Sequence, residues 1–260
     1  MERALCVVLR RPSVPVTVAG RTDAGVHAWG QVASYPGEPA RVKSLNALLP
    51  GDVAVLSCSD AGPAFDARRD ATSRAYCYRV LARTARATLE RARVLHWPYR
   101  LEFSLLQECA AALVGTHDFT AFTPTETEHV RFERDVLAAQ WESRVLVCGG
   151  ELVEFWIEAD AFMRHMNRVL VGTMLQVAGG RRSVSSFVEL LSGRPRAKAG
   201  PTAPAHGLFL AGVGYGGERV LGGDSRAAPA SYEQYGDPAT ATGTGYTGRQ
   251  TAQRGGPALG

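Results

Sequence analysis

The sequence is poor in cysteine, and its cysteines show no pairing pattern. Five occur among 260 residues, and no two of them have the spacing of a C-x-x-C motif. An odd number of scattered cysteines argues against a disulfide framework and against a cysteine zinc site. Isolated thiols of this kind are typical of a reducing compartment. The sequence therefore predicts a cytoplasmic protein that holds no metal.

Long apolar runs and a strong excess of one charge are also absent. No run approaches the ~20 apolar residues that a membrane-spanning helix requires, so no membrane association is predicted. The first residues, Met1–Cys6, carry charged side chains in a helical pattern, which is unlike a signal peptide. The net charge of +4 is carried mainly by arginine. Arginine binds phosphates well, so this charge permits a nucleic-acid partner without requiring one.

Large aliphatic side chains become scarce in the last part of the chain. The stretch 217–260 is rich in Gly, Ala, Thr and Ser, and such a composition buries too little apolar surface to fold. We expect this tail to be disordered. The preceding residues divide into two halves, 1–97 and 98–216, in which strands alternate with helices. The predicted fold class is α/β, of the α+β type.

The spacing of apolar residues predicts the individual elements, because alternation is typical of strands and a 3.6-residue period is typical of helices. The expected helices are 2–10, 40–49, 103–114, 161–177 and 185–191. The expected strands are 14–19, 31–35, 53–56, 72–81, 135–141, 151–158 and 207–215.

The stretch with the most distinctive composition is Gly20–Ala28, between the first two expected strands. It reads Gly-Arg-Thr-Asp-Ala-Gly-Val-His-Ala, with Asp23 near its centre and Arg21 two residues earlier. Asp and Gly are ordinary turn residues, so one interpretation is a turn in which Asp23 accepts backbone N–H groups. Loops held by strands also carry catalytic groups, and glycine lets a ligand approach the backbone closely.

The whole string resembles, residue for residue, the active-site motif of the TruA-type tRNA pseudouridine synthases. Five further segments resemble motifs of this family, and the similarity runs in the family's order from Met1 to about Tyr215. These segments are Leu45–Pro50, Phe65–Tyr78, Gly115–Phe119, Phe162–Arg168 and Thr202–Leu208.

The resemblance implies an isomerase that converts uridine in tRNA to pseudouridine. This reaction breaks the N-glycosidic bond, turns the base and rejoins it to the ribose through C5, and it consumes no cofactor. It needs one carboxylate as a nucleophile or a base, and the resemblance gives this role to Asp23. Attack on the base, attack on the ribose and removal of a ribose proton all stay open.

The resemblance also assigns partners to Asp23. Arg168 would pair with the carboxylate and stabilise its charged form, and Tyr76 would pack against the base once it has left its stack. Arg21 would fill the vacated space and contact a phosphate, and Leu208 would close the apolar wall of the pocket. Further candidates for phosphate contacts are Arg68, Arg69, Arg74, Arg181 and Arg182.

The implied fold is the pseudouridine synthase fold, in which two ferredoxin-like halves form a mixed sheet. Helices would line one face of this sheet, and a basic RNA-binding cleft with Asp23 at its floor would lie on the other. Members of the family act as homodimers on uridines 38–40 of the tRNA anticodon arm. The resemblance therefore implies two partners, tRNA and a second copy of the chain.

The sequence departs from the family's pattern in three places. The family's N-terminal strand does not precede the first helix, Asp66 stands where the family usually has histidine, and Cys77 stands where it has arginine. Loss of a strand would expose hydrogen-bonding edges, so one alternative is a non-catalytic RNA-binding remnant. A further alternative is a metal-dependent hydrolase using His117 and Asp118, although the histidine spacings match no metal-site template.

Overall fold

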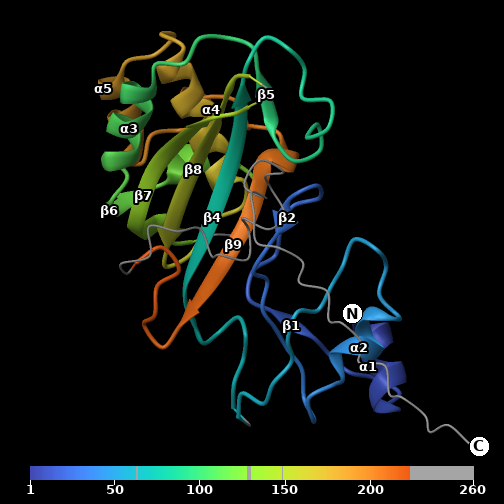
Figure 1. The fold of residues 1–260 in the computed structure, drawn as a ribbon. Coiled ribbons are helices and arrows are strands. Elements are labelled where there is room, and N and C mark those ends of the chain that lie inside the picture. The colour runs from blue at the N-terminus through green and yellow to red at the C-terminus, as the bar shows by residue number, and fades with distance from the viewer. Residues whose placement is uncertain (63, 128–129, 148, 223–260) are drawn as a thin grey trace, which may run out of the picture. The chain divides into compact units, whose positions relative to one another are not determined.

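A mixed β-sheet forms the centre of the part of the chain that the structure describes, residues 1–62, 64–127, 130–147 and 149–222. In this computed structural model the strand order is β2-β9-β4-β8-β7-β6, and β5 pairs with β4 (Figure 1). The strands are β2 (His27–Ala28), β4 (Ala71–Ala82), β5 (Leu95–Trp97), β6 (Gly115–Asp118), β7 (Glu133–Val145), β8 (Glu151–Ala159) and β9 (Leu208–Tyr215).

Strand β4 connects sequence-distant parts of the sheet. It runs antiparallel to both β8 and β9, and the register places Tyr76 opposite Ile157 and Leu210. At the edge of the sheet, β2 pairs with β9 in parallel. Because successive side chains of a strand point to opposite faces, Tyr76 and Tyr78 share one face of the sheet and Cys77 lies on the other.

One face of the sheet is covered by the helices α3 (Phe103–Ala111), α4 (Met166–Ala178) and α5 (Val184–Val188), which confirms the expected placement of helices (Figure 1). Their apolar side chains form one core cluster with Tyr76, Tyr78 and the inner residues of β7 and β8. In α4 every residue except Arg168 and Gln176 is buried, so this helix is packed on nearly all sides instead of having one solvent-exposed face. Short 3₁₀ helices are η1 (Thr120–Phe122), η2 (Glu189–Leu191), η3 (Arg196–Lys198) and η4 (Ala205–Gly207).

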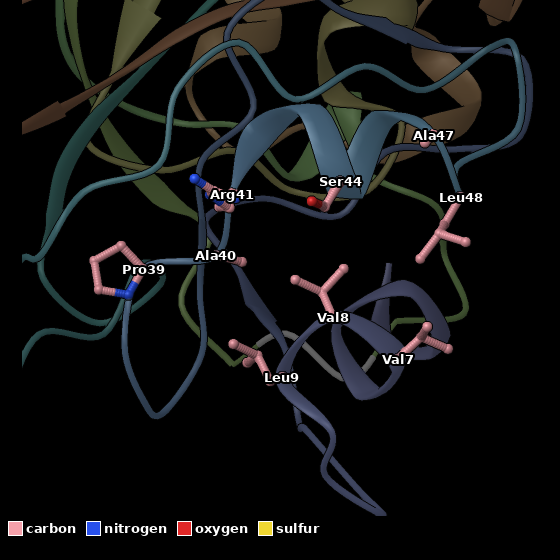
Figure 2. A pocket seen from close by; sticks show the side chains of 9 residues that line it. All are labelled: Val7, Val8, Leu9, Pro39, Ala40, Arg41, Ser44, Ala47 and Leu48. Atoms are coloured by element: carbon pink, nitrogen blue, oxygen red, sulfur yellow. The ribbon is translucent and has the colours of Figure 1, made fainter.

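A second apolar cluster forms from the first residues of the chain, around the side chains of Leu5 and Leu45. The helices α1 (Glu2–Leu9) and α2 (Val42–Asn46) contribute side chains to it. In the same part of the chain, β1 (Thr17–Val18) pairs antiparallel with β3 (Ala33–Ser34). Between α1 and α2 lies an open hollow of about 510 Å³ (Figure 2). It is lined by Val7, Val8, Leu9, Pro39, Ala40, Arg41, Ser44, Ala47 and Leu48.

The structure bears out most of the expected elements, and differs at a few. The elements α1, α3, β4, β7, β8 and β9 confirm the helices and strands expected at their positions. The strand expected at 53–56 is wrong, because the backbone N–H and C=O of Val55 bind the side chain of Asn46 at 2.7 and 2.9 Å. The helix expected at 161–177 begins only at Met166. Strands β2, β5 and β6 have no counterpart among the expected elements.

The chain continues to make contacts beyond residue 217. The backbone N–H groups of Val220 and Leu221 donate to the carboxylate of Glu158 at 2.9 and 2.7 Å, so the packed part extends past the start of the expected tail. Residues 223–260 of that tail lie outside the described residues. The boundary expected at residue 97 stays a prediction, and β4 from one side of it shares a sheet with β8 and β9 from the other.

Close packing of α4 requires a glycine at position 172. A Cβ on Gly172 would overlap the carbonyl oxygen of Pro201. Alanine normally stabilises a helix by about 1 kcal/mol relative to glycine, but here the overlap would force α4 away from its neighbour. We expect Gly172→Ala to reduce the free energy of unfolding by about 1–3 kcal/mol in urea denaturation.

The matched control for this prediction is Gly51→Ala. An added Cβ on Gly51 meets nothing within 4 Å, so this variant should unfold at nearly the same urea concentration as the unsubstituted chain. Equal stability of the two variants would contradict the close contact at Gly172.

Candidate active site

Asp23 lies in a loop that is held at both ends. At the first end, Gln31 donates to the carbonyl of Gly20 at 2.8 Å. At the other end, β2 pairs with β9, and the backbone N–H of Trp29 donates to Leu210 at 2.8 Å. Within the loop, Gly25 adopts a φ of 83°, which glycine reaches without strain. The loop therefore presents the half-buried Asp23 side chain from a fixed frame.

The carboxylate of Asp23 contacts two side chains from the start of α4. The Arg168 guanidinium donates from Nη1 to Asp23 Oδ2 at 2.8 Å, and His165 Nε2 lies 3.4 Å from the same oxygen. No other described residue forms a hydrogen bond or ion pair with the Asp23 side chain. The carboxylate is thus held through Oδ2, and Oδ1 is left without a protein partner among the described residues.

Arg168 is itself fixed by the neighbouring segment. Its Nε donates to the carbonyl of Ala203 at 2.8 Å, and the N–H of Ala203 donates back to the Arg168 carbonyl at 3.0 Å. The Arg168 side chain is only 16% exposed. A guanidinium with so little water around it needs an anionic partner, and Asp23 supplies that charge.

His165 precedes α4 in a left-handed backbone conformation, with φ 63° and ψ −4°. Burial lowers the pKa of its imidazole below the ordinary value, and the positive charges of Arg168, Arg164 and Arg196 act in the same direction, while Asp23 opposes them. The imidazole is therefore neutral at pH 7. The sequence analysis did not include His165 in the site, although His165 lies in the same Phe162–Arg168 motif as Arg168.

Tyr76 borders the same site from β4. It is buried, its ring meets Phe162 edge to face at 5.0 Å, and a Cβ on Gly20 would lie 3.7 Å from its hydroxyl. Burial raises the pKa of the Tyr76 phenol to about 12, with Asp23 acting in the same direction and Arg74 against it. The neighbouring Tyr78 is also buried, and its hydroxyl donates to the carbonyl of Pro204 at 2.8 Å.

Residues 109–216 of the chain match a family described as tRNA pseudouridine synthase. A tRNA pseudouridine synthase A from Myxococcus xanthus is 40% identical over 209 residues, which cover 78% of this chain and 77% of the relative. Relatives of the same name from Bacillus pumilus and Anoxybacillus flavithermus are 36% and 38% identical, covering 78% and 83% of this chain and 82% and 87% of theirs. The chain belongs to the tRNA pseudouridine synthase family. Members of this family are isomerases.

For this member of the pseudouridine synthase family, the structure brings Asp23, Arg168 and Tyr76 together, in line with the roles that the resemblance implies. Those roles stay predictions. Leu208 is buried in the core cluster, opposite Tyr78 on the neighbouring strand. Arg21 is exposed on the loop, two residues before Asp23, and forms no ion pair within the described part of the chain.

The arginines expected to contact phosphates differ in how far their side chains already bind other residues of the chain. The Arg74 guanidinium donates to four backbone carbonyls, those of Ala71, Asp160, Ala19 and Arg68, at 2.9–3.2 Å. Arg69 pairs with Asp70 at 2.9 Å, and Arg182 donates to Lys198 and Ser186. Arg68 and Arg181 are exposed. Phosphate contacts of these five arginines stay predictions.

Asp66 and Cys77, two of the three departures from the family's pattern, have local roles. The side chain of Asp66 accepts the backbone N–H groups of Arg68 and Arg69 at 2.9 and 2.8 Å, which closes the turn before β4. Cys77 is fully buried against Trp156 and Ala211 on the sheet face opposite Tyr76. Neither side chain contacts Asp23.

The described residues contain neither a cluster of metal ligands nor a membrane-spanning helix. Among them, no three or more His, Cys, Asp or Glu side chains are grouped so that they could hold a metal ion. In the candidate hydrolase motif, Asp118 instead accepts hydrogen bonds from the backbone and hydroxyl of Thr120 at 2.8 and 2.6 Å. No helix within the described ranges is both long and apolar enough to cross a membrane.

The raised pKa of Tyr76 gives a direct spectroscopic prediction. Subtracting the alkaline titration of Tyr76→Phe at 295 nm from that of the unsubstituted chain should leave one phenol that ionises near pH 12 instead of near 10. Tyr99→Phe is the matched control, because Tyr99 is 62% exposed and this variant keeps Tyr76, so it should still show the ionisation near pH 12. If the Tyr76→Phe difference appeared near pH 10, the buried environment assigned to Tyr76 would be wrong.

Proposed function

We propose that this chain converts uridine to pseudouridine in the anticodon stem-loop of tRNA, with Asp23 as the catalytic carboxylate. The observation that carries the proposal is the pairing of Asp23 Oδ2 with Arg168 at 2.8 Å inside a family of tRNA pseudouridine synthases. In the reaction the bond between C1′ and N1 breaks, a bond between C1′ and C5 forms, the hydrogen on C5 leaves as a proton and N1 gains a proton.

The geometry supports an ionised Asp23 with one oxygen directed to substrate. Arg168 neutralises the carboxylate, which offsets the free-energy cost of its partial burial. Arg168 donates to Oδ2 and His165 lies beside the same oxygen, so Oδ1 is available to act as nucleophile or base. Whether it acts at C6 of the base or at the ribose follows from the position of the bound uridine.

Tyr76 suits a packing role at the extruded base. Because burial raises the pKa of its phenol to about 12, the hydroxyl stays protonated at neutral pH and cannot serve there as a general base. Its ring is fixed by Phe162, which gives a rigid aromatic surface for a flipped uracil. Leu208, on the adjacent strand, would close the apolar side of the pocket.

The substrate would be tRNA, with uridines 38–40 as the target positions, and the chain would act in the cytoplasm as a homodimer. Exposed arginines beside the site, among them Arg21 and Arg164, suit contacts with the tRNA backbone. The alternative, an RNA-binding remnant, has less support, because the pair of Asp23 and Arg168 is intact and a remnant has no need of it.

Substitution of Asp23 tests the proposal. We expect Asp23→Ala to abolish tritium release from tRNA labelled at uridine C5, because only rearrangement at C5 expels that atom. Affinity for tRNA should stay within about tenfold, since phosphate contacts supply most of the binding free energy. Tritium release measures the first quantity and filter binding the second.

Asp52→Ala is the matched control, because Asp52 is an exposed aspartate of the same charge, and it should release tritium at the unsubstituted rate. Undiminished release by Asp23→Ala would contradict the mechanism. No release by the unsubstituted chain, with tRNA still bound, would favour the remnant.

Arg21 gives a second test, through the salt dependence of binding. If Arg21 contacts one phosphate, Arg21→Ala should reduce the slope of log affinity against log salt by about 0.7 to 0.9, and it should lower kcat/KM about tenfold. Arg3→Ala, which removes an exposed arginine from α1, is the control and should change neither quantity. If the slope of log affinity against log salt were the same for all three chains, Arg21 would not contact a phosphate.

A further inference from the structure

His165 contacts the proposed catalytic carboxylate, and no role has been assigned to it so far. Its Nε2 lies 3.4 Å from Asp23 Oδ2, the oxygen that Arg168 also binds. We propose that His165 is a positioning residue, whose Nε2–H and the Arg168 guanidinium hold Asp23 Oδ2 from two directions so that Oδ1 faces the substrate. This inference rests on the proposed function, because it concerns the same carboxylate.

The backbone at His165 supports this assignment. A φ of 63° is uncommon for any residue other than glycine, and asparagine is the next most tolerant. Strained backbone of this kind persists where the surroundings fix it, and it clusters at functional sites. Glycine would adopt this backbone conformation with less strain. The presence of histidine here therefore indicates that its side chain has a function.

Two donors on one oxygen do more than a single donor can. A carboxylate held only by Arg168 Nη1 can still rotate about its own Cβ–Cγ bond, whereas a second donor from another direction restricts that rotation. His165 lies at the N-cap of α4 and Arg168 lies in the first turn of this helix, which is buried on nearly all sides. Their positions relative to each other are therefore fixed by the core.

The charge state of His165 suits this positioning role. The charged groups that act on the imidazole are Asp23 from the loop, Arg168 from α4, Arg164 from the preceding segment and Arg196 from η3. Burial and the three arginines lower the pKa of His165, so at pH 7 it is a neutral donor. A neutral donor orients the carboxylate while withdrawing less negative charge from Oδ1 than a second cation would.

The contact can be tested without measuring activity, by NMR titration of the histidine side chains. Asp23→Asn should lower the pKa of His165 further, because the charge that raises it is removed. Arg168→Gln should raise it, because a positive charge is removed. His117, which has no contact with Asp23 or Arg168 in the described residues, is the internal control and should behave identically in all three chains. If the His165 pKa is the same in all three chains, Asp23 and His165 are not in contact and the inference is wrong.

Kinetics of two variants separate a backbone role from a side-chain role. Asparagine tolerates the left-handed backbone but is too short to reach Asp23, whereas glutamine fits the backbone less well and places its amide N–H near the position of Nε2. We expect His165→Asn to lower kcat for tritium release about tenfold or more with KM within about twofold. His165→Gln should recover most of kcat while being the less stable variant.

The outcomes distinguish failure of this inference from failure of the proposed function. A kcat for His165→Asn equal to that of the unsubstituted chain, or lower activity in the glutamine variant than in the asparagine variant, would overturn the positioning role while leaving Asp23 catalysis intact. His117→Asn is the activity control and should match the unsubstituted chain. If the unsubstituted chain released no tritium, the proposed function would fail, and the NMR titration would still decide whether His165 faces Asp23.

Discussion

The ion pair between Asp23 and Arg168 is the contact on which the rest of the site depends. It joins two residues that are 145 positions apart in the sequence, one in a loop and one in a helix. A distance of 2.8 Å between their side chains requires both elements to be held independently. The loop is held by Gln31 and by the pairing of β2 with β9, and the helix is held by the core. The site is thus a product of long-range packing, and no single segment contains it.

The packing of helix α4 holds Arg168 in place for its ion pair with Asp23. Apolar side chains surround it on nearly every side, and Arg168 is the charged residue that the surrounding packing must accommodate. Its guanidinium is satisfied by Asp23 and by the carbonyl of Ala203, so removal of either partner would leave a desolvated cation. The glycine at position 172 lets the segment of Pro201 approach α4, which keeps Ala203 within reach of Arg168. The close packing of the core therefore fixes the position of Arg168, and through it the position of the Asp23 carboxylate.

The sequence singles out candidate site residues but does not give their geometry. Asp23, Arg168 and Tyr76 lie in motifs, so pattern alone made them candidates, and alternation identified β4 and β8 because both strands are long. His165 was not included because its contact with Asp23 depends on a left-handed φ that no pattern reports. The strand expected at 53–56 was wrong because local apolar alternation does not reveal that the Asn46 side chain takes the hydrogen bonds of Val55. Short strands such as β2 follow from tertiary pairing with β9, which local propensity does not encode.

Arg74 shows why charge in a sequence does not by itself indicate a substrate contact. Its guanidinium has five N–H donors, and it binds four carbonyls that lie at the end of β1, in the turn before β4, at the start of β4 and just after β8. Burial lowers the pKa of this arginine, and its hydrogen bonds tie together the segments that frame the Asp23 loop. A guanidinium so engaged has little capacity left for a phosphate. Under the proposed function, contacts with the tRNA backbone would then fall mainly to exposed arginines such as Arg21, Arg68 and Arg164.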